Sequence, residues 1–108
     1  MPKGTIVLIP FPFTDLSGQK VRPALILYSS EHGEDCIVAF ISSIKEKKIR
    51  HFEVLLPASV TNGLKIDSVI KVDKIATLQK MTVLGQLGTL EPQFAKLVNS
   101  KLKTLFHL

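Results

Sequence analysis

The chain has 108 residues, the size of one ordinary domain, and is long enough to bury a single hydrophobic core without disulfides or structural metals. Its 14 Lys and Arg residues outnumber its 9 Asp and Glu residues, which gives a formal net charge of +5. This charge favours an acidic partner, such as a nucleic acid, an acidic peptide or a membrane surface, although lysines used only for solubility would give the same balance. We predict one domain over residues 1–108.

Cysteine usage and hydropathy argue against a disulfide-stapled or membrane-spanning protein. The single cysteine, Cys36, lies in the apolar run 36–41 (CIVAFI), so no intrachain disulfide can form and a reducing compartment is indicated. The apolar stretch near the amino terminus is interrupted by Pro10 and Pro12 and does not resemble a signal peptide. No run is long enough to span a bilayer. We expect a buried thiol and a cytoplasmic protein.

Short apolar segments rich in Val and Ile recur along the chain, and their length predicts β-strands. They cover residues 6–11, 23–28, 36–41, 52–56, 68–72 and 82–87. Polar turn segments with a glycine able to take positive φ lie between them, at residues 16–19, 31–35 and 61–63. This pattern predicts tight, antiparallel connections.

Helical periodicity is confined to the carboxyl-terminal end of the chain. Phe94, Val98, Leu102 and Leu105 follow one helix face, while lysines fall elsewhere and toward the end of the segment. Pro92 suits the first turn, where a missing N–H costs nothing. Several strands followed by one helix predict a mainly β (α+β) fold, a small antiparallel sheet or barrel packed by a C-terminal α-helix.

Arg22 is one of only two arginines in a lysine-rich chain, and it opens the apolar strand segment 21–27 (VRPALIL). Pro23 disfavours helix at residue 22 and extends the backbone there. A planar guanidinium with five donors suits phosphate better than an ammonium group does. The placement therefore predicts a phosphate-handling site at the start of this strand.

Residues 4–15 (GTIVLIPFPFTD), the Ser-Gly loop after them, and residues 21–27 together resemble the start of the PemK/MazF family of toxins from bacterial toxin–antitoxin pairs. The turn, the arginine, the proline and the strand all fall in the family's order. Residues 41–43 (ISS) are similar to the strand end where the family carries a Thr or Ser. Residues 67–77 look like the family's later strand pair, so the resemblance covers nearly the whole chain.

The resemblance implies a small SH3-like barrel with a C-terminal helix, usually a homodimer, that cleaves single-stranded RNA without a metal ion. It also implies an acidic, partly disordered antitoxin that occupies the RNA groove. The family's arginine corresponds to Arg22 and its hydroxyl residue to Ser42. In some relatives an Arg and an Asp on one strand contribute acid and base, and those positions fall near Lys71 and Asp73.

Three positions depart from the family's pattern. Thr5 stands where an aspartate usually follows the opening glycine, and Ala76 stands where many relatives have an arginine before Thr77. The first loop lacks a glutamate that some members carry, which leaves Asp15 as the carboxylate nearest to Arg22. These departures affect the expected activity and specificity more than the expected fold.

Metal-free RNA cleavage requires a base to take the 2′-hydroxyl proton, cations to stabilise the charge at phosphorus, and a proton for the leaving 5′-oxygen. Arg22 suits charge stabilisation, because a permanently protonated guanidinium is a poor proton donor. Asp73, Asp15 and His51 compete as the base. Lys71 and Asp73 are two residues apart on a strand, which fits a catalytic pair or a solvated surface pair equally well.

Ser42 fits a hydrogen bond to a phosphate oxygen, with a serine that satisfies local backbone as the alternative. The basic run 45–50 (KEKKIR) follows at once and would track an RNA backbone or form a solvated loop. Phe13 is the best candidate for stacking on a base. The full set of candidate RNA-binding residues is Phe13, Thr14, Lys20, Ser43, Lys45, Lys47, Lys48, His51, Lys74 and Thr77.

Other chemistries have weaker support in the sequence. His32, Glu34 and Cys36 are close together, yet their spacing matches no zinc or calcium loop, and no glycine-rich phosphate loop occurs, so we expect neither a metal nor a cofactor. Two alternatives to an endoribonuclease stay open. One is a catalytically weakened nucleic-acid- or protein-binding module on the same barrel, and the other is a basic barrel with a structural role in a ribonucleoprotein.

Overall fold

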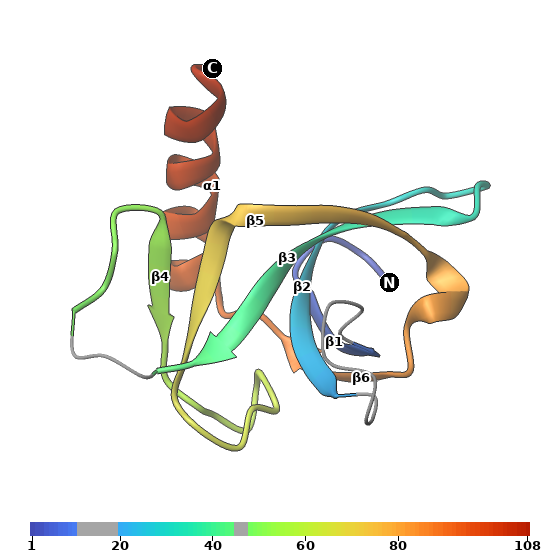
Figure 1. Cartoon of the computed structure of the whole chain (residues 1–108), viewed down its shortest axis with the longest axis horizontal. Helices are drawn as coiled ribbons and strands as arrows, with labels where there is room; N and C mark the ends of the chain where they lie inside the picture. The colour runs from blue at the N-terminus through green and yellow to red at the C-terminus, as the bar shows by residue number, and fades with distance from the viewer. Residues whose placement is uncertain (11–19, 45–47) are drawn as a thin grey trace.

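Six strands and one C-terminal helix form the described part of the chain, which comprises residues 1–10, 20–44 and 48–108 of the computed structural model (Figure 1). The strands lie close to the predicted segments, because alternating apolar residues mark each of them. Their bounds are β1 (Thr5–Pro10), β2 (Val21–Ser29), β3 (Asp35–Ser43), β4 (Glu53–Leu56), β5 (Ser68–Gln79) and β6 (Gly85–Thr89). A 3₁₀ turn, η1 (Lys80–Thr82), precedes β6, and α1 (Pro92–Phe106) ends the chain.

All six strands belong to one sheet with the order β4-β5-β3-β2-β1-β6, and every pairing is antiparallel. The sheet curls into a half-barrel, and α1 packs beside its β4 and β5 end (Figure 1). Right-handed strand twist and interruptions in the pairing favour such curvature. The predicted mainly β (α+β) fold, a small SH3-like antiparallel barrel with a C-terminal helix, is confirmed, and its sheet closes as a half-barrel.

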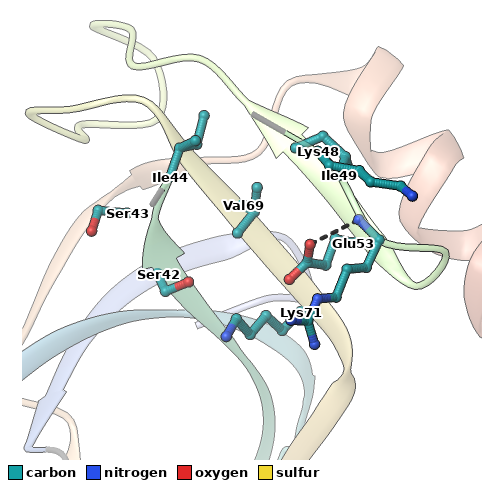
Figure 2. Close-up of a pocket in the computed structure, with 9 residues that line it drawn as sticks. Ser42, Ser43, Ile44, Lys48, Ile49, Glu53, Val69 and Lys71 are labelled. Atoms are coloured by element: carbon teal, nitrogen blue, oxygen red, sulfur yellow. Dashed lines mark hydrogen bonds between the residues drawn. The ribbon is translucent and has the colours of Figure 1, made fainter. Parts of the chain in front are cut away.

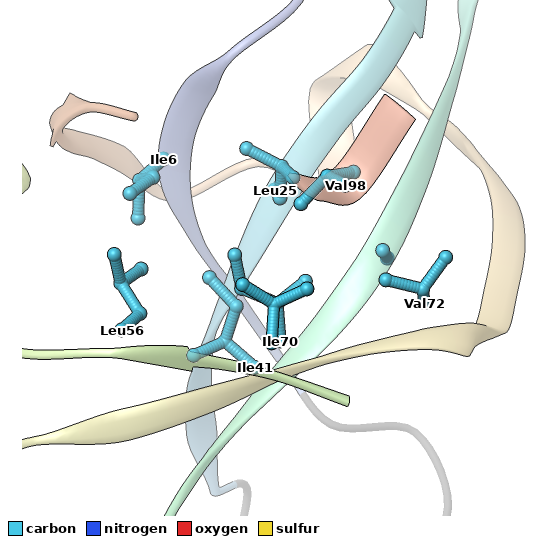
Figure 3. Packing of buried hydrophobic residues seen from close by; sticks show 9 residues of the cluster. Ile6, Leu25, Ile41, Leu56, Ile70, Val72 and Val98 are labelled. Atoms are coloured by element: carbon cyan, nitrogen blue, oxygen red, sulfur yellow. The ribbon is translucent and has the colours of Figure 1, made fainter. Parts of the chain in front are cut away.

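Alternate residues of the strands face two different hydrophobic clusters. The larger cluster lies on the side of the sheet that α1 covers, and Figure 3 shows its side chains converging between the strands and Val98 of the helix. Its buried members are Ile6, Leu25, Ala39, Ile41, Val54, Leu56, Ile70, Val72 and Val98. The smaller cluster is on the opposite face and consists of Val7, Ile9, Ala24, Ile26, Cys36 and Val38. The buried Cys36 agrees with the expected buried thiol.

Strand β5 is a single twelve-residue strand, so the strand pair that the resemblance implied over residues 67–77 is wrong. No Gly, Pro or Asn interrupts the segment, and the chain therefore continues instead of turning back. The pairing with β3 slips within it: Phe40 lies opposite Lys71, whereas its neighbour Ala39 lies opposite Ile75. Residues 72–74 thus form a bulge, and bulges bend a strand.

Helix α1 begins with Pro92 in its first turn, as predicted. It ends at His107, which takes a left-handed conformation with φ 58°. The Leu108 N–H donates to the Lys103 carbonyl at 2.9 Å, which satisfies a carbonyl at the helix end. Val98 is buried, and this residue fixes the inner face of the helix against the sheet.

The connection between β4 and β5, residues 57–67, is longer than the tight turn that we predicted around residues 61–63. The fully buried Asn62 organises it: its Oδ1 accepts from the Ser59 and Leu64 N–H groups, and its Nδ2 donates to the Pro57 carbonyl and to Glu91. These bonds join the connection to the residue that precedes α1. The hydrogen bonds of the buried Asn62 side chain thus hold this longer loop together, where we had predicted a short turn.

Glycine is required where this connection meets β6. Gly63 has φ +73°, as its predicted turn role needs, and a Cβ there would lie 2.0 Å from the Leu87 carbonyl oxygen. Gly33, in the other described turn, does not take positive φ, and its N–H donates to Ser30 Oγ instead.

Among residues 1–10, 20–44 and 48–108, no helix is sufficiently long and apolar to cross a membrane.

Candidate active site

The sheet register brings Arg22 and Ser42 to the same face and to the same end of the sheet. Strands β2 and β3 pair with Ala24 opposite Phe40, and the same register continued by two residues sets Arg22 opposite Ser42. Because side chains two residues apart on a strand point the same way, both residues lie on the face opposite to α1. Both are half-buried, and Arg22 lies opposite the fully buried Ile9 of β1.

Beside Ser42 the sheet carries a surface pocket of about 170 Å³ (Figure 2). Ser42 and Lys71 lie at one end of it, while Ile44, Lys48 and Ile49 lie at the other. Strands β3 and β5 provide its floor, since Ser42 pairs with Val69 and Phe40 with Lys71. The complete lining is Ser42, Ser43, Ile44, Lys48, Ile49, Arg50, Glu53, Val69 and Lys71.

Glu53 and Lys71 face each other across the β4–β5 pairing and reach the same pocket. The chain before β4 holds Glu53 in place: the Arg50 N–H donates to Glu53 Oε1 at 2.9 Å, and the Glu53 N–H donates to the Arg50 carbonyl at 3.0 Å. The first of these bonds appears as the dashed line in Figure 2. The pocket therefore combines three cations, one fixed carboxylate and two serine hydroxyls.

The structure brings together five residues of the predicted site and separates others from them. Arg22 lies opposite Ser42 in the continued β2–β3 register, and Ser42, Ser43, Lys48 and Lys71 line one pocket. Asp73 and Lys74 do not line this pocket, because the bulge in β5 carries them out of the β3 pairing as exposed residues. The predicted partnership of Lys71 with Asp73 therefore has no geometric support here.

Three further predicted residues lie apart from the pocket. His51 is exposed before β4, packs edge-on against Phe52, and offers its carbonyl to Lys101 of α1. Thr77 pairs with Ile37 and is exposed on the opposite face of the sheet from Ser42. Lys20 is exposed just before β2, two residues from Arg22.

Five predicted site residues lie outside the described part of the chain. Phe13, Thr14 and Asp15 belong to segment 11–19, and Lys45 and Lys47 belong to segment 45–47. Their roles stay predictions.

Arg50 and Glu53 are pocket residues that sequence reasoning did not assign to the site. Arg50 is the second of the two arginines and closes the basic run that we read as an RNA-tracking segment. Glu53 opens β4, whose alternate residues Val54 and Leu56 are buried, a pattern that places Glu53 on the other, polar face. Lys71 lies opposite Glu53 because β4 pairs with β5 across the connection 57–67. The sequence near Glu53 alone does not predict this pairing.

The departures at positions 5 and 76 have local structural accounts. The buried Thr5 hydroxyl donates to the Pro2 carbonyl at 2.7 Å, so this residue stabilises the turn before β1. Ala76 is half-buried against the smaller cluster and pairs with Val38. Neither side chain reaches the pocket.

In the described ranges no three His, Cys, Asp or Glu side chains gather closely enough to hold a metal ion.

The fold resembles solved structures of MazF toxins. MazF from Deinococcus radiodurans is 23% identical, with a TM-score of 0.78 over 100% of this chain and 97% of that chain. The Mycobacterium tuberculosis toxin MazF-mt6 is 24% identical, with a TM-score of 0.75 over 96% of this chain and 97% of that chain. A mycobacterial endoribonuclease in complex with its cognate antitoxin is 19% identical, with a TM-score of 0.77 over 100% and 96% of the two chains. At these identities the likeness defines the structural class, a MazF-like fold.

Sequence comparison identifies the family itself. The family described as PemK-like, MazF-like toxin of type II toxin-antitoxin system matches residues 2–106. The chain belongs to this toxin family, and the family resemblance drawn from its sequence is confirmed. No curated protein matches the chain.

Proposed function

We propose that this toxin is an endoribonuclease that cuts single-stranded RNA by attack of a 2′-hydroxyl on the neighbouring phosphorus, without a metal ion, acting as one domain over residues 1–108. Its family membership supports a toxin of a toxin–antitoxin pair. The observation that carries the chemistry is the convergence of Arg22, Ser42 and Lys71 on one end of one sheet face. Two cations and a hydroxyl in that arrangement suit a phosphate whose negative charge grows during the reaction.

In the proposed reaction the O2′–P bond forms and the P–O5′ bond breaks, which leaves a cyclic phosphate and a 5′-hydroxyl. Arg22 and Lys71 stabilise charge on the nonbridging oxygens, and the Ser42 hydroxyl donates a hydrogen bond to one of them. The base that takes the 2′-hydroxyl proton is Asp15, Asp73 or His51, of which Asp73 and His51 lie outside the pocket. A proton from solvent converts the leaving 5′-oxygen to the 5′-hydroxyl. Duplex RNA resists, since A-form stacking keeps the attacking oxygen out of line.

The partners of the proposed enzyme follow from its charge and family. A formal charge of +5 favours an acidic antitoxin that covers the Arg22 and Lys71 face and displaces RNA. We propose a homodimer as the working form and the cytoplasm as its location. A binding module on the same fold is the second candidate, supported by the absence of the first-loop glutamate that some members of the family carry.

Incubation of purified protein with a randomised single-stranded RNA pool in EDTA tests the proposal. We expect cleavage with cyclic phosphate and 5′-hydroxyl ends, and we expect Arg22→Ala to reduce the rate by about 100-fold or more with the fold retained. Lys103→Ala, an exposed lysine of α1, is the matched charge-loss control and should leave the rate within about twofold. RNA binding without cleavage would favour the binding module, and strict dependence on an added divalent ion would overturn the metal-free mechanism.

A further inference from the structure

One end of the pocket has no role in the phosphate chemistry proposed above. Beyond Ser42 and Lys71 the pocket is bounded by Ile44, Ile49 and Val69, with Glu53 between the two ends (Figure 2). Val69 is only 5% exposed, so it forms a closed apolar floor. Six of the nine lining residues are polar or charged, so the apolar floor is surrounded by groups that can orient a planar ligand through hydrogen bonds.

We propose that this end of the pocket receives one unstacked base of the RNA strand and that Glu53 selects bases that carry an exocyclic amine, namely adenine, cytosine and guanine over uracil. The inference rests on the proposed function, because it takes the nucleotide next to the cut phosphate as the occupant. That nucleotide is the natural occupant, since the phosphate-binding end and the apolar end belong to one continuous pocket.

The apolar end suits the flat face of a base. Single-stranded RNA is recognised through splayed bases that pack on a protein surface and expose their Watson–Crick edges. Ile44 and Ile49 provide side walls for a ring lying on Val69. The whole pocket, its phosphate end included, has a volume of about 170 Å³, so its apolar end has no room for a stack of several bases.

The polar edge of the pocket has a defined hydrogen-bonding preference. A carboxylate is acceptor-only, and one oxygen of Glu53 is already held by the Arg50 N–H at 2.9 Å. The other oxygen can accept from an exocyclic amine, as carboxylates accept from cytosine N4. Uracil lacks the amine and carries only the N3–H donor on this edge, and the two carbonyl oxygens that flank this donor repel an approaching carboxylate. Arg50 and Lys71, which line the same pocket, provide donors for the ring acceptors of the favoured bases.

Cleavage-site sequencing with a randomised single-stranded RNA pool tests the selection. In wild-type products we expect uracil to be depleted by about tenfold at one position next to the cut, the ratio that a single base contact provides. Glu53→Gln should bring uracil to within about twofold of the other bases, because the amide can donate to a uracil carbonyl while its oxygen still accepts from Arg50. Leu55→Ala is the matched control: Leu55 is exposed on the same strand and face, outside the pocket, and its variant should retain the wild-type depletion.

A second measurement separates this inference from the proposed cleavage. Isotope-labelled protein is titrated with each of the four nucleoside 3′-monophosphates, and the amide signals of Glu53 and Val69 should shift with the three amine-bearing nucleotides but not with uridine monophosphate. This result stands even if no RNA is cut. Equal shifts with all four nucleotides, an unchanged cleavage profile for Glu53→Gln, or a folded Glu53→Gln protein that cuts no sequence would each overturn the selective role.

Discussion

The two faces of the curled sheet are built from the same strands and serve different purposes. On β5, Ile70 and Val72 face the cluster under α1, whereas the alternate residues Val69 and Lys71 face the pocket. The same division holds on β4, where Val54 is buried and its neighbour Glu53 lines the pocket. Period-two alternation therefore separates stability from chemistry by a single step along the chain. Substitutions at adjacent positions should have opposite consequences.

The largest expected effect is on the covered face. Ile70 is fully buried in the large cluster, and Ile70→Ala should lower the free energy of unfolding by about 2–5 kcal/mol through lost burial and a cavity. Urea unfolding measures this loss. Cleavage per folded molecule should stay close to wild type, and a specific loss of activity in the folded fraction would contradict the division between the faces.

The next largest loss of stability is expected in the connection that joins β4 to β5. Asn62→Ala removes a fully buried amide and leaves the Ser59 and Leu64 N–H groups without their acceptor, which should cost about 3 kcal/mol. The exposed Asn99 of α1 is the control, and Asn99→Ala should change stability by no more than about 0.5 kcal/mol. Equal losses in the two variants would show that the buried network contributes no stability.

At Lys71, the neighbour of Ile70, we expect a smaller effect, and we expect it on the cleavage rate rather than on stability. Lys71→Gln removes a pocket cation without removing core volume, so cleavage should fall by about tenfold while the unfolding free energy changes by no more than about 0.5 kcal/mol. Single-turnover cleavage and urea unfolding of the same preparation measure both quantities. A large stability loss without a rate effect would assign Lys71 to the structure.

The smallest effect concerns Cys36 in the smaller cluster. Burial, together with the nearby Asp35 carboxylate, raises the pKa of this thiol above its ordinary value, and Lys80 partly opposes the shift. The unfolded chain therefore loses the thiol proton at lower pH than the folded chain does. The resulting stability is complete below the unfolded pKa and declines as pH rises toward the folded one. Urea midpoints of the wild type should fall between pH 7.5 and 9.5 by more than those of Cys36→Ala, and equal slopes would contradict this.

Local patterns predicted most of the fold. Alternation and turn residues identified the strands, and the spacing of Phe94, Val98 and Leu102 identified the helix. The bulge in β5 was missed because it arises from the pairing of β5 with β3. No residue type within the β5 segment indicates this pairing. Pairing also explains the incomplete site: Arg22 and Ser42 were expected from a motif, while the place of Glu53 beside them follows only from strand register.

The pairing of β1 has a consequence for how quickly the chain can fold. Thr5 lies opposite Thr89, so the first strand is hydrogen-bonded to an element from near the other end of the chain as well as to its neighbour β2. Such non-local pairing requires a long loop to close, and the entropy lost in closing it precedes the favourable contacts between the strands. Sheets of this kind fold in about milliseconds to seconds rather than microseconds. During that interval the edge of β1 that later pairs with β6 is unprotected, and refolding of this toxin should be sensitive to protein concentration.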